Sequence, residues 1–284
     1  MTTGQLLATA WEWDPSVLVG CAGLAVGYLA AVRWRLPRRG LYTLGGIALL
    51  LLTLEGPLDA LGDDYLFSAH MAEHLVLILV IPPLLLLGLP EGPLRRLLAH
   101  RPAAMAERVL SNPPIAWLLC IVTLWVWHLP ALYNLTLADE QVHVFEHLTF
   151  LVTATIFWWP VLTPIKELRM APFPAIFYLY SAALANTVLG IILTFTPAGL
   201  YPAYLHPADE LGALHLIRQG WGITADADQE LGGLFMWVGG MFAFLWAILA
   251  MLARWYAESA HTDDGSGVAS TAAAGGAKPG GTIL

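Results

Sequence analysis

The chain has 284 residues, of which 58% are hydrophobic and only 12% are charged, and its formal net charge is −8. Soluble domains are about 45–50% apolar and about 25% charged, so this composition excludes a soluble globular enzyme and a largely disordered chain. We therefore interpret the chain as an all-α, polytopic membrane protein whose surroundings are the lipid bilayer, and we expect no nucleic-acid partner.

Seven stretches are long and apolar enough to cross a bilayer as helices, since a span needs about 20 such residues. In chain order they are 16–34, 41–61, 66–89, 114–133, 141–162, 173–195 and 231–254. Glu55, Gly56 and Pro57 interrupt the second, and Pro82-Pro83 predicts a kink in the third. Residues 1–257 are thus predicted to form a seven-span helix bundle, and the Gly-, Ala-, Ser- and Thr-rich segment 258–284 a disordered cytoplasmic tail.

The basic residues predict the orientation of the bundle, because Lys and Arg collect in cytoplasmic loops. Twelve of the 13 follow spans one, three, five and seven, and only Arg218 falls on the opposite face. The N-terminus is therefore predicted outside and the C-terminus in the cytoplasm. Thirteen acidic residues lie in or beside the outer loops, and the longest outer loop, 196–230, is long enough to fold over the mouth of the bundle.

Two copies of the pattern HxxEH lie near the outer ends of the third and fifth spans. They contribute His70, Glu73 and His74, and His143, Glu146 and His147. In a helix this spacing places the three side chains within roughly one 100° face. An ionisable group inside hydrocarbon needs a partner, so the two patches are predicted to face one another across a metal or a cofactor.

Further residues extend this predicted site. His128, near the outer end of the fourth span, is an optional ligand, and Glu73 and Glu146 are predicted to orient the imidazoles from a second layer. Asp228 and Met236, by the outer end of the seventh span, are assigned to a gate or access route. Imidazole suits copper, zinc, iron and nickel alike, so the pattern leaves the metal open.

Other interpretations compete with a metal-ion site. Facing histidines on two helices also suit bis-His ligation of haem b in a membrane redox protein. HxxEH is the inverzincin protease signature as well, but two copies with no further ligand motif argue against proteolysis. A third possibility is a scaffold whose histidines only hold the bundle together. We predict no catalytic residues and do not expect an enzyme.

Several segments together resemble the CtaG family of multi-span bacterial proteins that assemble caa-type cytochrome c oxidase. They are FSAHMAEHLVLILVIPPLLLLGLP (67–90), WHLPALY (127–133), HVFEHLTFLVTATIFWWPV (143–161) and DQELGGLFMW (228–237). The positions that match the family motifs are His70, His74, His128, His143, Glu146, His147, Asp228, Gln229 and Met236.

The resemblance implies a seven-span protein of the bacterial plasma membrane that is needed to make active haem–copper oxidase. It further implies copper as the bound metal, with cytochrome c oxidase subunits as partners and the copper B centre as the destination. The leading hypothesis is a non-catalytic copper chaperone with His70, His74, His143 and His147 as ligands and His128 as an optional one. Zinc and haem b are the less favoured alternatives.

Overall fold

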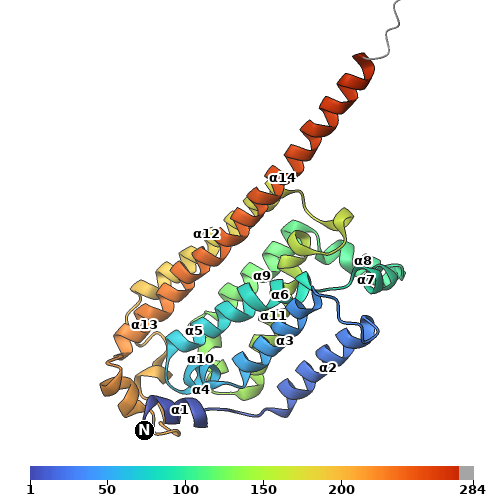
Figure 1. Ribbon diagram of the computed structural model, residues 1–284. Helices are drawn as coiled ribbons and strands as arrows, with labels where there is room; N and C mark the ends of the chain where they lie inside the picture. The colour runs from blue at the N-terminus through green and yellow to red at the C-terminus, as the bar shows by residue number, and fades with distance from the viewer. Residues whose placement is uncertain (275–284) are drawn as a thin grey trace, which may run out of the picture.

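The computed structural model describes residues 1–274, with side chains described through Ala260, and the regular elements in this part of the chain are all helical. The helices of the first half are α1 (Thr3–Thr9), α2 (Pro15–Ala31), α3 (Gly40–Leu54), α4 (Pro57–Asp64), α5 (Phe67–Leu75), α6 (Ile81–Leu87), α7 (Glu91–Leu98) and α8 (Arg101–Leu110). Those of the second half are α9 (Pro113–Trp127), α10 (Pro130–Thr136), α11 (Glu140–Leu162), α12 (Pro172–Phe195), α13 (Ala225–Leu234) and α14 (Gly240–Ala274). In Figure 1 they form an elongated bundle with α2 at one edge and α12–α14 along the other.

Four of these helices are long and apolar enough to cross a membrane: Phe67–Leu87, Glu140–Leu162, Pro172–Phe195 and Ala225–Ala260. Two bent pairs raise the number to six if each pair is one span, namely α3 with α4, bent by 40°, and α8 with α9, bent by 69°. Helix α2 is apolar but has only 17 residues. A multi-span, all-helical fold is thus confirmed for the described residues, while the seventh span and the orientation stay predictions.

The first predicted span, 16–34, is shorter in the structure because its end leaves the helical conformation. Arg33 and Trp34 have positive φ angles of 54° and 58°, a left-handed backbone that stops α2 at Ala31. The fourth predicted span, 114–133, is divided for a different reason. A residue before proline avoids the α region, and Leu129 is accordingly extended before Pro130, which begins α10. His128 therefore lies at a helix break.

Helices α5 and α6 run on as one helix through a π-helical turn, Val76–Val80, just before the proline pair. Pro82 has no N–H to donate to the carbonyl of Ile78, as a regular helix would require. The indole Nε1 of Trp158 in α11 donates to that carbonyl instead, at 2.9 Å. This bond fastens α11 to α5–α6 and so helps to hold the two HxxEH segments together.

Helices α12, α13 and α14 pack along one another on the far side of the bundle (Figure 1). A Cβ atom added at Gly190 would meet the backbone of Trp237, and one at Gly233 would meet the backbone of Thr194. These two glycines therefore permit a close approach that a larger side chain would block. Asn186 reinforces the contact, because its amide donates to the Met236 carbonyl at 2.6 Å.

Helix α14 continues to Ala274 and so includes residues 258–274 of the segment predicted to be a disordered tail. Residues 275–284, the remainder of that predicted tail, lie outside the described residues.

Candidate metal centre

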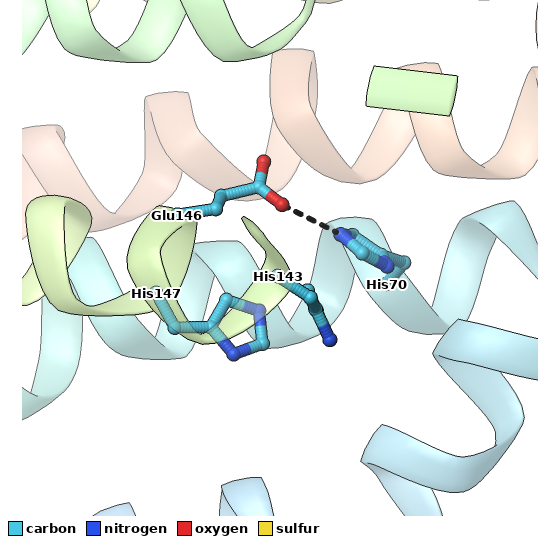
Figure 2. Close-up of side chains that lie close together, drawn as sticks. All are labelled: His70, His143, Glu146 and His147. Carbon is cyan, nitrogen blue, oxygen red and sulfur yellow. Dashed lines mark ion pairs between the residues drawn. The ribbon is translucent and has the colours of Figure 1, made fainter. Parts of the chain in front are cut away.

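The two HxxEH patches face one another inside the bundle. Figure 2 shows His70 opposite His143, Glu146 and His147, with the Glu146 carboxylate pointing toward the His70 ring. One ligand atom from each of these four buried residues lies within 4.8 Å of every other. Three imidazoles and a carboxylate thus converge on one point, as the facing arrangement of the two helices predicted.

The polar atoms of this cluster approach one another without forming hydrogen bonds. The Nε2 atoms of His70 and His74 lie 3.9 and 3.7 Å from the Glu146 carboxylate oxygens, and His147 Nδ1 lies 4.0 Å from Glu73 Oε1. These separations exceed hydrogen-bond length. Within the described chain, both carboxylate oxygens of Glu73 and of Glu146 have no hydrogen-bond partner. An unpaired buried charge costs roughly several kcal/mol, so the cluster has the character of a cation site.

Helix α4 adds two acidic residues that the sequence analysis counted only among the acids of the outer face. Asp63 Oδ2 lies 3.0 Å from His143 Nδ1, and Asp63 Oδ1 lies 3.6 Å from His70 Nδ1. A carboxylate beside Nδ1 orients an imidazole so that Nε2 is free to bind a metal. Asp59 joins Glu73 and His147 in a second group of potential ligands. In the sequence, the feature that pointed to these two aspartates was their i, i+4 spacing after the helix-breaking Gly56-Pro57.

His74 and His128 lie beside the four-residue group rather than in it. The rings of His74 and His128 are 5.5 Å apart, and His74 also packs 4.6 Å from Phe150. His128 Nδ1 lies 2.7 Å from the Leu124 carbonyl, which leaves Nε2 without a partner among the described residues. Of the five predicted ligands, His70, His143 and His147 belong to the four-residue group, and His74 borders it, with its ring 4.3 Å from that of His70. Metal binding itself stays a prediction.

Asp228 and Met236 make contacts of another kind. The Asp228 carboxylate accepts hydrogen bonds from the backbone N–H groups of Phe67 and Ser68, at 2.8 and 3.1 Å, and from the Ser68 hydroxyl at 2.5 Å. It thereby caps the N-terminus of α5, whose own N-cap residue, Leu66, makes no side-chain cap. Met236 is buried in the apolar core. These contacts position helices, whereas the sequence had assigned both residues to a gate.

Three tyrosines cover the side of the cluster that faces the loop 196–230. Tyr201 donates to the His128 carbonyl and Tyr204 to the Gly62 carbonyl, both at 2.8 Å, and the hydroxyls of Tyr133 and Tyr204 are 2.9 Å apart. All three side chains are buried. Two of them come from the long outer loop, which therefore folds over the bundle as its length suggested.

A cleft of about 620 Å³ reaches the cluster from the side, between α2, α3, α4 and α11. Its polar lining includes Glu12, Asp59, Asp63, Glu140, His143 and His147. Burial, and then the charges of Asp63 and Asp64, raise the pKa of Glu12 above its ordinary value, which is the response expected where negative charges are concentrated. The cleft thus offers a cation a polar path to the imidazoles.

Comparison with known proteins identifies the family. The profile of the cytochrome c oxidase caa3 assembly factors, Caa3_CtaG, matches residues 23–258. This chain belongs to that family. The family membership confirms the resemblance seen in the sequence and covers the segments that build the cluster, from α4 to α11.

The chain is also similar to curated proteins of mycobacteria. Two uncharacterized proteins, from Mycobacterium bovis and Mycobacterium tuberculosis, are each 29% identical over 273 residues, covering 87% of this chain and 39% of theirs. A third, from Mycobacterium leprae, is 24% identical over 294 residues, covering 90% and 43%. The chain thus spans about two fifths of the length of these relatives. No solved structure matches it.

Because Asp228 caps α5, we expect its replacement to reduce the stability of the fold and not metal binding. Asp228→Ala should lower the free energy of unfolding by about 0.5–2 kcal/mol, the usual cost of losing an N-cap. Thermal unfolding in detergent checks this, with Asp226→Ala, an exposed acid of the same helix, as the matched control. Loss of bound copper at unchanged stability would instead support the gate.

Proposed function

We propose that this assembly factor binds copper inside the membrane bundle and passes it to a cytochrome c oxidase subunit. The observation that carries the proposal is the group formed by His70, His143, Glu146 and His147, whose ligand atoms lie within 4.8 Å of one another and include carboxylate oxygens without partners in the described chain. Family membership supplies the assembly role. The role is one of binding and transfer, with no catalytic step.

The ligand types favour copper in the divalent state. Nitrogen and oxygen donors suit Cu²⁺, whereas Cu⁺ prefers thiolate and thioether sulfur. Both cysteines and Met236 belong to the apolar clusters of the bundle instead. The same donors also suit Zn²⁺. The association of the family with a copper-containing oxidase is what selects copper for the proposal.

The geometry gives less support to haem or to a purely structural cluster. Bis-His haem ligation needs two imidazoles on opposite sides of a flat ring, but here the His143 and His147 rings lie 4.0 Å apart on one helix and His70 lies 5.3 Å from His143. A cluster that only holds the bundle together should be hydrogen-bonded throughout, as buried polar groups usually are. The unpartnered imidazole and carboxylate atoms favour a site for an ion.

We further propose the full topology, with seven spans in the bacterial plasma membrane, the N-terminus outside and the C-terminus in the cytoplasm. Helix α2 is then the first span despite its 17 residues, and α3–α4 and α8–α9 are bent spans. The distribution of Lys and Arg supports this orientation. This topology would place the cluster near the outer face of the membrane.

Cysteine labelling tests this topology. A membrane-impermeant maleimide added to intact cells should label Glu210→Cys and should label Asn112→Cys only after lysis. Both positions are exposed, and they are assigned to opposite faces. The native Cys21 and Cys120 are buried, so an otherwise unaltered chain provides the background control. The reverse labelling pattern would contradict the orientation.

Metal analysis tests the copper site. After incubation with Cu²⁺ and removal of unbound metal, the purified protein should retain copper, and His143→Ala/His147→Ala should lose most of it because two imidazoles of the group are removed. His206→Ala, an exposed histidine of the outer loop, is the matched control and should bind as the unaltered protein does.

The same double variant tests delivery in cells. It should accumulate normally while the oxidase contains less copper and loses activity. Normal copper content in the oxidase of cells carrying this variant would rule out transfer from this site. A Soret band that disappears in the variant would support the haem alternative instead.

A further inference from the structure

The cluster offers more potential ligand side chains than one metal ion can bind. Glu73 is fully buried, both of its oxygens lack partners among the described residues, and it is not a member of the four-residue group of the proposed copper site. Glu73 instead belongs to two further groups, one with Asp59 and His147 and one with Asp63 and His70, and in each of them one ligand atom from each residue lies within 4.8 Å of the others. The second group, of Asp59, Glu73 and His147, is buried throughout.

From this second group we infer that the cluster holds two metal ions. We assign His70, His143 and Glu146 to one ion and Asp59, Glu73 and His147 to the other, since Asp63, which groups with His70 and Glu73, already lies beside the Nδ1 atoms of His70 and His143. His147 is common to both groups, and with two ions present it binds the second. The inference rests on the proposed function, because it adds a second position to the same centre.

Charge balance supports two ions. The carboxylates of Asp59, Asp63, Glu73 and Glu146 together carry four negative charges when ionised, which two divalent cations neutralise and one does not. Arg218 is the basic residue that the charge pattern assigns to this face, and its guanidinium donates to the carbonyls of Ile223 and Tyr204 rather than to these acids. In the described part of the chain, the ion pairs of Asp63, Glu73 and Glu146 are with imidazoles.

Copper stoichiometry and electron paramagnetic resonance test the inference. The protein loaded with Cu²⁺ should hold two ions per chain, and their closeness should broaden or abolish the signal expected of isolated Cu²⁺. Glu73→Gln should bind one ion and show the isolated signal. The matched control is Asp64→Asn, which removes a neighbouring acid of α4 outside both groups and should retain two ions.

The outcomes separate this inference from the proposed function. One copper per chain in the unaltered protein, lost in His143→Ala/His147→Ala, would overturn the second position and leave the copper site standing. Two coppers in Glu73→Gln would overturn the assignment of Glu73. No bound copper in any form would overturn both.

A different observation, the lateral cleft, carries a second proposal: we infer that ions reach the cluster from the side, between α2 and α11. Asp59, His143 and His147 line both the cleft and the cluster, so an ion in the cleft meets these ligands first. The direct outer route is filled by Tyr133, Tyr201 and Tyr204, whose hydroxyls are tied to one another and to the backbone.

Two glycines of α2 provide a matched test. Gly20 lines the cleft and Gly23 does not, and a Cβ added at either would meet nothing within 4 Å. Gly20→Phe should therefore slow copper loading severalfold, measured as quenching of tryptophan fluorescence after mixing with Cu²⁺, while the final stoichiometry stays unchanged. Gly23→Phe should load as the unaltered protein does. Equal rates for Gly20→Phe and the unaltered protein would overturn the lateral route.

Discussion

The unpaired carboxylates of Glu73 and Glu146 are the constraint on which the rest of this structure depends. Each is fully buried on a helix long and apolar enough to cross a membrane, and each faces the imidazoles of the opposite helix at distances too long for hydrogen bonds. Such groups destabilise an apolar bundle unless a cation neutralises them. The copper ion that we propose for this site would therefore also stabilise the bundle, because an ion that binds only the folded state favours folding.

Interruptions of the helices bring the remaining ligands to this point. The break at Gly56-Pro57 turns α4 so that Asp63 lies beside His70 and His143, and the break before Pro130 leaves His128 at the end of α9. Each break places polar side chains within a largely apolar bundle. Irregular backbone is tolerated at such depth where it is buried in protein, as it is around this centre.

Contacts between distant segments fix the positions of the two main helices. Asp228 supplies the cap that α5 lacks, and the Trp158 indole occupies the Ile78 carbonyl that Pro82 leaves free. The outer loop contributes Tyr201 and Tyr204 to the wall above the imidazoles. The centre is thus covered by the tyrosines on one side and open to the lateral cleft on another.

The sequence by itself determined the membrane class, the helical fold, the family and the shared face of each HxxEH segment, because apolar length and helical period are local properties. It also located the interruption at Glu55–Pro57. The i, i+4 spacing of Asp59 and Asp63 placed both acids on one helix face, but it did not indicate that they would join the histidines, and nothing local indicated that Asp228 would cap a helix 160 residues away. Those relationships depend on how helices pack, and packing brings together residues whose local sequence contains no record of one another. Only the tertiary structure could therefore show which donors lie together and that a cleft reaches them.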